Sequence, residues 1–447
     1  MKPNKRILVS IFVMAAASAM AATAPEVLDV NMTQLANKFV SITYKLTNGP
    51  AVVTLDIQTN SAPGVWASIG AQNIDMLDGD VNRLVSGGDA STTRSITWRP
   101  WKSWPGHEIG AGKARAVVTA WATNAPPDYM VVSLAAEANP RTRYYASVDA
   151  LPGGLLANTA YRTSLLVLRR IHAAGITWMM GQNTENTAET EKSHDVTLAN
   201  DYYIGVFPIT QKQWSNVAGT GLPAYYNGGG HGDMRPMEWV AFRDVRESPI
   251  SGTGQWCGGA ANENYMYPNP PNPDSYLGQL CTRTHVDFDL PSEAQWEYAC
   301  RGGYGDGHWG DGSLYTNSST DANLSRIACY GRTKSDDRGI DPAEGGTPIV
   351  GSYEPNAFGL YDMHGCVFEH CLDWVDADIT ALNGVPNVNG KYRLTTPETT
   401  TDMHIRRGGN YRFGSQYCRP SFRNNNNPNG YRLDDTGFRV ICPAVAK

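Results

Sequence analysis

The stretch Gly359-Leu-Tyr-Asp-Met-His-Gly-Cys-Val-Phe-Glu-His-Cys-Leu-Asp-Trp374 gathers aromatic rings, histidines, two thiols and three carboxylates around one glycine. Asp362 and Glu369 lie seven residues apart in it. In an extended loop, alternate carbonyls point the same way, so a set of backbone oxygens can converge between the two acids; these belong to Met363, Gly365 and Val367. Mixed carboxylate and carbonyl oxygens suit calcium. On spacing alone, a buried turn with two solvated acids remains the other interpretation.

The same stretch resembles the signature Gly-Leu-Tyr-Asp-Met-x-Gly-Asn-Val-Trp-Glu-Trp of the formylglycine-generating enzyme family, also called sulfatase-modifying factor domains. In that family the residues that match Asp362 and Glu369 ligate a structural calcium ion together with the intervening carbonyls. The resemblance therefore implies a calcium site here. The chain departs from the signature at three positions, where it carries Cys366, Phe368 and His370 in place of Asn, Trp and Trp.

Further segments match the family in chain order: Trp178–Gly181, His194–Leu198, Tyr203–Thr210, Arg235–Trp239, Asp289–Gly303, Arg407–Arg419 and Gly437–Val440. The resemblance implies a distorted C-type-lectin-like domain with sparse secondary structure. Within these segments, Thr210 predicts the start of a helix over 211–217, and Ser292 is a good N-cap for a helix that ends at a glycine pair.

The N-terminal half of the chain has a different sequence pattern. Alternating apolar residues predict short strands over 39–46, 51–57 and 114–121, separated by turn signals. We expect an antiparallel β-sandwich over 25–148, similar to fibronectin-like or immunoglobulin-like modules. A linker over 149–163 and a second domain over 164–443 complete an α+β chain. Three tryptophans form either a carbohydrate platform or packing contacts in the sandwich: Trp98, Trp101 and Trp104.

The N-terminus has the pattern of a targeting sequence. Basic residues precede an apolar run over 7–17 and the small-x-small sequence Ala19-Met20-Ala21, the pattern of a signal peptide over 1–22 cleaved near Ala21. The run is too short to span a bilayer. We expect a secreted, periplasmic or cell-surface protein with no membrane span. All eight cysteines lie between residues 257 and 442, and an oxidising compartment favours disulfides whose pairing the sequence does not give.

A second calcium segment is implied by Asp321-Ala-Asn-Leu324, which resembles the family's other metal-binding turn. Its matching ligands are the Asn323 side chain and the Leu324 carbonyl, with Asp341 as a further candidate. A solvated Asx turn is the alternative.

The family's chemistry resides in the segment that Arg407–Arg419 resembles. Its enzymes use two cysteines five apart, which bind copper(I), activate oxygen and oxidise a sulfatase cysteine to formylglycine. Paired soft thiolates suit Cu(I). Here Cys418 matches the second cysteine, but Phe413 stands at the first and Asn410 replaces a serine. Phenylalanine cannot ligate copper. Cys418 is therefore a catalytic candidate, and copper a cofactor, only if another thiol joins it.

Two alternatives concern the cysteines. Cys366 and Cys371 also lie five apart, beside His370, and could form a relocated copper or redox site. A local disulfide, or bridges to other cysteines, is the simpler interpretation. Cys418 itself can equally be a structural half-cystine or a buried thiol.

The same C-terminal segment predicts a binding surface, because tyrosine, serine and asparagine are adaptable contact residues. It resembles the variable regions of lectin-like display proteins that retroelements diversify. The candidate contact residues are Asn410, Tyr411, Arg412, Tyr417, Asn425 and Tyr431. Asparagine-rich loops that merely satisfy a turn-rich backbone are the alternative.

Three functions follow from this sequence. The leading hypothesis is an exported, non-catalytic or altered-function protein that binds a protein or glycan partner, possibly a sulfatase, through its C-terminal face. The alternative is a formylglycine-generating oxidase, and a third is another oxygen- or iron-dependent activity of this fold. A net charge of −6, without a basic run after the first residues, argues against nucleic acid as a partner.

Overall fold

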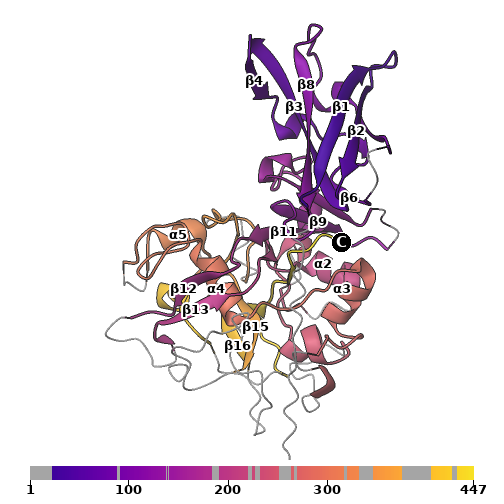
Figure 1. Ribbon diagram of the computed structural model, residues 1–447. Coiled ribbons are helices and arrows are strands. Elements are labelled where there is room, and N and C mark those ends of the chain that lie inside the picture. Colours follow the sequence, from indigo (N-terminus) through magenta and orange to yellow (C-terminus); the bar gives the residue numbers. More distant parts are fainter. Residues whose placement is uncertain are drawn as a thin grey trace, which may run out of the picture.

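The computed structural model describes residues 23–87, 91–136, 138, 140–183, 191–219, 224–226, 232–250, 263–265, 269–316, 320–331, 346–374, 404–424 and 430–447. The predicted signal peptide lies outside these residues. The indigo strands of the first part stand at one end of the molecule, and a larger mixed part follows at the other (Figure 1). The predicted α+β class is confirmed, since antiparallel sheets dominate and the described helices are short.

The first part is an antiparallel sandwich. One sheet has the order β1 (Glu26–Gln34), β2 (Val40–Thr47), β7 (Arg94–Trp98) and β5 (Leu77–Gly79). In the other sheet, β3 (Ala51–Ala62) pairs with β4 (Val65–Ser68), β6 (Arg83–Val85) and β8 (Ala114–Ala122). Burial alternates strictly along β2, as expected for a strand with one face in the core. The shared core includes Ile42, Tyr44, Val53, Ile57, Ile96 and Trp98.

The main sheet of the second part changes the expected domain boundary. It has the order β10 (Thr142–Tyr145), β9 (Tyr129–Ser133), β11 (Leu165–Ile171), β14 (Tyr202–Gly205) and β18 (Ile441–Pro443). Strands β9 and β10 fall within the range assigned above to the sandwich, yet β9 is hydrogen-bonded to β11 along its whole length. The sheet of the second part therefore includes strands from residue 129 onward, before the expected boundary at 164.

The expected linker over 149–163 is part of the core as well. It contains the short turns η2 (Val148–Ala150) and η3 (Thr159–Arg162). Three of its side chains are buried in the second domain: Leu151, Leu155 and Tyr161. The C-terminus reaches the end of the sandwich, because the Ala446 amide donates to Thr123 O, directly after β8, at 2.8 Å. It is also held to the main sheet, since the Lys447 amide donates to the Tyr144 hydroxyl of β10 at 2.9 Å.

Three helices cover this sheet region, and local caps explain where they begin. In α2 (Gln211–Ala218), the Thr210 hydroxyl accepts from the Gln213 amide at 3.2 Å. In α4 (Glu293–Arg301), Ser292 and Gln295 form the same capping box, and Gly302 at φ 59° ends the helix. Both predicted helices are confirmed. The helix α3 (Tyr276–Thr284) was not predicted; its Tyr276 ring stacks on Trp214 at 4.6 Å.

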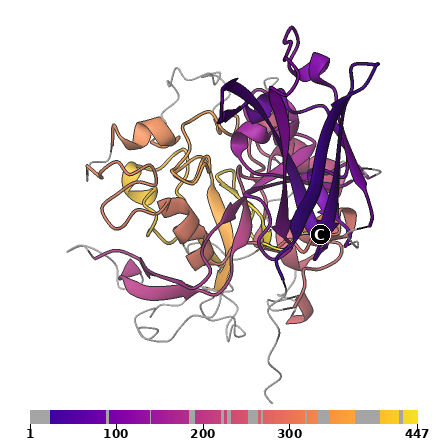
Figure 2. The ribbon, with the colours of Figure 1, turned by 45° about the horizontal axis from the view of Figure 1, so that its top comes forward.

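The stretch Gly359–Trp374, called the deciding stretch below, ends in a strand of a further small sheet. Strand β15 (Phe368–Trp374) pairs with β16 (His404–Arg407) and runs parallel to β17 (Thr436–Gly437). Both views show these orange and yellow segments together, away from the indigo sandwich (Figures 1 and 2). The remaining described elements are β12 (Ile176–Met180), β13 (His194–Leu198), α1 (Pro100–Ser103), α5 (Leu324–Ile327), and the short turns η1 (Ala71–Asn73), η5 (Gly232–Met234), η6 (Arg243–Glu247), η7 (Glu263–Tyr265) and η10 (Ser415–Tyr417).

Candidate functional site

A buried ion pair joins the deciding stretch to the C-terminal Gly-Phe-Arg segment. The Arg439 Nε and Nη2 atoms donate to Glu369 Oε2 and Oε1 at 2.6 and 2.7 Å. The Trp296 indole donates to the same Oε2 at 2.6 Å. Arg439 also donates to the carbonyls of Gly205 and Tyr361. Glu369 is thus fully engaged by protein donors.

Asp362 is held differently. Its φ is 58°, its side chain is buried, and Oδ2 accepts from the Gly351 amide at 2.8 Å. Its Oδ1 has no hydrogen-bond partner. Burial raises the pKa of this carboxyl to about 6 because desolvation disfavours the charged form.

As arranged, the residues expected to bind calcium do not fit that ion. The Glu369 oxygens face a guanidinium, whose positive charge opposes a divalent cation. The Met363 carbonyl faces the Cys300 thiol, with Sγ and O 3.6 Å apart. Within the described ranges, no group of three or more acidic, histidine or cysteine side chains could hold a metal. Gly365 and Val367 lie in the same loop, directly before β15.

The second expected calcium segment forms a hydrogen-bonded turn. The Asn323 side-chain amide donates to Leu314 O at 2.9 Å. The Asp321 carboxylate accepts from the amides of Asn323 and Leu324 and from the Trp309 indole. Burial opposes ionisation of Asp321, yet backbone hydrogen bonds outweigh it and lower its pKa. This is the hydrogen bonding of an Asx turn, although Asp321 is buried and not solvated. Asp341 lies outside the described residues.

Cys418 is a buried thiol in a closed environment. Its Sγ would lie 2.6 Å from a Cβ at residue 409, so only glycine fits there. Its carbonyl accepts from His364 Nδ1 at 3.0 Å, and His364 Nε2 accepts from the Gly310 amide at 3.1 Å. Burial, with a contribution from Cys329, raises the pKa of the Cys418 thiol. At neutral pH Cys418 is therefore protonated and a poor nucleophile.

Phe413 occupies the position expected for the first catalytic cysteine, and it belongs to a cluster of aromatic rings. It is 40% exposed, and its ring centroid lies 5.1 Å from Tyr417 and 6.1 Å from Phe368. Tyr417 in turn lies 5.1 Å from Phe422. An aromatic cluster thus stands where the family's first catalytic thiol would lie.

Some of the residues expected to form a binding surface are buried in the structure, and others are exposed. Asn410 and Tyr411 are buried, unlike the expectation. Asn410 braces the loop, because its Oδ1 accepts from the amides of Arg412 and Phe413 while its Nδ2 donates to Asp435. Arg412 and Tyr431 are exposed and Tyr417 is half-buried. Asn425 lies outside the described residues.

Sequence reasoning missed a neighbouring aromatic group. Tyr225 is 59% exposed and lies 5.3 Å from the Trp239 ring. The Tyr226 ring meets Tyr411 at 5.9 Å, and both Tyr226 and Asp434 accept from the Arg412 guanidinium. The adjacent Tyr225 and Tyr226, shortly before a glycine run, were the sequence feature that could have indicated this group. We define the aromatic face as Tyr225, Tyr226, Trp239, Arg412, Phe413, Tyr417 and Tyr431.

Glu238 holds the backbone of the tyrosine pair in the aromatic face. It is fully buried, and its carboxylate accepts from the amides of Tyr225 and Tyr226 at 3.1 and 2.7 Å. Burial raises the pKa of Glu238 to about 8. The exposed tyrosine pair therefore stands on a buried, hydrogen-bonded support.

Other expected sites are dispersed. Trp98 belongs to the sandwich core and stacks on Trp104, with ring centroids 6.5 Å apart, whereas Trp101 stacks on Phe39. These contacts fit the packing alternative. Cys371 lies in a different core cluster from Cys366. The described cysteines with free thiols include Cys281, Cys300, Cys371, Cys418 and Cys442. The expected disulfides stay a prediction.

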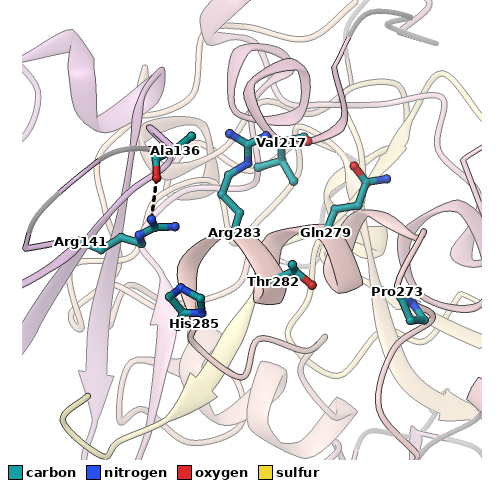
Figure 3. A pocket seen from close by; sticks show the side chains of 8 residues that line it. All are labelled: Ala136, Arg141, Val217, Pro273, Gln279, Thr282, Arg283 and His285. Carbon is teal, nitrogen blue, oxygen red and sulfur yellow. Dashed lines mark hydrogen bonds between the residues drawn. The ribbon is translucent and has the colours of Figure 1, made fainter.

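A hollow of about 420 Å³ between α2, α3 and the segment after β9 contains two arginines and a histidine (Figure 3). Arg141 donates to Ala136 O, and Arg283 donates to the carbonyls of Leu134 and Val217. The C-terminal ends of two helices meet here and carry partial negative charge. Both arginines thus donate to backbone carbonyls, and Arg283 reaches Val217 O in the last turn of α2.

Comparison with known proteins adds to this geometry. A model of the sulfatase-modifying factor enzyme 1-like domain matches residues 169–444. The formylglycine-generating enzyme of Thermomonospora curvata is 33% identical over 159 residues, which are 34% of this chain and 48% of that enzyme. The chaperone protein LppX of Paenibacillus barcinonensis is 27% identical over 212 residues, 43% of this chain and 68% of that protein. The chain thus spans about half the length of that bacterial enzyme.

Among solved structures, Treponema denticola variable protein 1 is similar at 25% identity and a TM-score of 0.43, over 62% of this chain and 95% of that one. PvdO from Pseudomonas aeruginosa is similar at 22% identity and a TM-score of 0.45, over 62% and 94%.

Fold and site together define a class: a helix-poor α+β domain of the formylglycine-generating enzyme type, preceded by a β-sandwich. Because the matched range covers more than half of its residues, the chain belongs to the sulfatase-modifying factor enzyme 1-like family. Its described helices include none long and apolar enough to cross a bilayer.

Proposed function

We propose that this protein is an exported, non-catalytic member of its family that binds a protein or glycan partner through the aromatic face. The observation that carries the proposal is Phe413, an exposed ring where an oxidase of this family needs a thiol. A phenyl ring offers no electron pair suited to Cu(I) and cannot exchange electrons as a thiol does.

The composition of the aromatic face supports binding. Exposed tyrosine, tryptophan and arginine side chains dominate the affinity of many interfaces. The support below the face is rigid, because Glu238 and Asn410 hold its two segments through backbone amides. Such preorganisation lowers the entropy that binding must overcome.

A second function has one observation in its favour. The Cys329 thiol lies close enough to Cys418 to contribute to its raised pKa. If these two thiols shared a copper ion, the chain would be a formylglycine-generating oxidase with a relocated cysteine. Cys418 would then be catalytic and copper its cofactor.

Two measurements separate these functions. Cu(I) titration of the reduced, mature chain and turnover of a sulfatase peptide should both be negative. Tight one-to-one copper binding that Cys418→Ser abolishes, together with peptide oxidation, would establish the oxidase and overturn our proposal.

Binding itself is tested on a glycan array and with purified sulfatases. We expect Phe413→Ala and Arg412→Ala to weaken any detected binding at least tenfold. Trp101→Ala is the matched control, since it removes an exposed aromatic side chain of the sandwich. Equal binding by all variants would place the contact outside the aromatic face.

A further inference from the structure

Two cysteines lie against each other directly behind the aromatic face. The Cys366 amide donates to the Cys329 carbonyl at 2.7 Å. Standard bond lengths then limit the distance between their Cα atoms to about 6.6 Å. Disulfides span Cα distances of roughly 4.4–6.8 Å, so the backbone is already close enough for a bridge.

The side chains share one environment. Cys329 and Cys366 are buried in the same small cluster, together with Tyr353 and Tyr411. The approach of the two segments depends on Gly365, whose added Cβ would lie 2.3 Å from Cys329 O. Only glycine permits this contact, and it brings the next residue, Cys366, next to Cys329.

The other thiols of this region have different surroundings. Cys418 packs with the residues of α5 and against Gly409. Cys300 Sγ lies 3.7 Å from the His364 ring nitrogens. Cys371 belongs to the main core of the second domain. Among the described cysteines, Cys366 is thus the one that is backbone-bonded to Cys329.

We propose that Cys329 and Cys366 form a disulfide in the mature protein, an inference that rests on the export included in the proposed function. One thiol loses its proton, and the thiolate attacks the disulfide of an oxidant, which can be a dithiol oxidoreductase or glutathione disulfide. The second thiolate then displaces the oxidant from the mixed disulfide. The two electrons pass to the oxidant, which leaves as thiols.

This bridge would brace the aromatic face. The Cys366 carbonyl accepts from the Tyr411 amide at 3.0 Å, and the Gly331 amide donates to Phe413 O at 2.8 Å. Both ends of the 411–413 segment are therefore bonded to residues at or beside the two cysteines. A covalent link between them fixes the backbone that presents Arg412 and Phe413.

The test is disulfide mapping of the mature chain, folded in glutathione buffer and digested without reduction. We expect a peptide pair joined through Cys329 and Cys366 that separates on reduction. Alkylation of both cysteines in denaturant without reductant, or a bridge from either one to Cys418, would overturn the proposal.

A stability measurement provides the second readout. Dithiothreitol should lower the Tm of the wild-type chain by about 5 °C and leave the Tm of Cys329→Ser/Cys366→Ser unchanged. Cys371→Ser is the matched control, because it removes a buried thiol of the same stretch and should keep the response. An equal response in all three proteins would refute the bridge. A mapped bridge without partner binding would refute only the proposed function.

Discussion

Three buried glutamates of the second domain pair with arginine. Glu293 pairs with Arg407 and Arg423, Glu297 pairs with Arg301 and Arg407, and Glu369 pairs with Arg439. Removing one partner of such a pair leaves a buried charge, whereas removing both relieves it. The effect of single substitutions should therefore exceed that of double ones.

Arg439→Gln tests this expectation at the buried Arg439–Glu369 pair. We expect a loss of about 3–5 kcal/mol in the free energy of unfolding, measured by urea denaturation. Arg439→Gln combined with Glu369→Gln should cost less than the single change. A double variant that is no more stable than the single one would contradict this account.

His364 makes stability depend on pH. Burial lowers its pKa to about 4, whereas the unfolded chain protonates it near 6.5. Between these values the unfolded state binds more protons, so stability falls as the pH is lowered from 6.5 to 4. Asp362, whose pKa is raised to about 6, acts in the opposite direction.

The measurement compares the wild type with His364→Asn, whose side-chain amide can still donate to Cys418 O. From pH 7 to pH 5, the wild type should lose about 2 kcal/mol more than the variant. Equal slopes for the two proteins would show that another group controls the acid response.

Site residues could be predicted only where local spacing in the sequence assigns them. Phe413 and Cys418 could be assigned from local spacing. The partner of Glu369 could not, because Arg439 lies 70 residues away and is also held by the distant carbonyls of Gly205 and Tyr361. The burial of Asn410 and Tyr411 likewise depends on Asp435 and Tyr226, which are distant in sequence.

At the level of elements, the question is whether the loop before β15 needs a metal ion or is stabilised by protein donors alone. Arg439 and Trp296 satisfy Glu369, so we expect EDTA to leave the Tm of the purified chain unchanged within about 1 °C. Calcium at millimolar concentration should not raise it. A calcium-dependent rise in Tm that Glu369→Gln removes would mean that the loop rearranges around the ion.

Helices and strands differ in how well the sequence predicts them. The helices α2 and α4 were predicted because Thr210 and Ser292 are caps that act within one turn. Strand β9 was assigned to the wrong part because four of its five residues are buried, and a strand covered on both faces lacks the alternation that identifies it. Its partner is then visible only in the folded sheet.

At the scale of the molecule, sheet topology fixes where the chain can be divided. A fragment over 124–447 retains β9 and β10 and should fold, as judged by far-ultraviolet circular dichroism and a cooperative melt. A fragment over 149–447 lacks both strands, exposes the edge of β11, and should aggregate. Cooperative melting of the shorter fragment would show that β9 and β10 are dispensable.

Strand β18 pairs with β14, and Tyr203 faces Cys442 across a separation of more than half the chain. During synthesis, the main sheet cannot close until residue 443 has left the ribosome. Until then the edge of β14 stays open and its apolar residues lack their final partner. Contacts of such long range slow folding, so this protein should depend on a holding chaperone between translation and completion of its sheet.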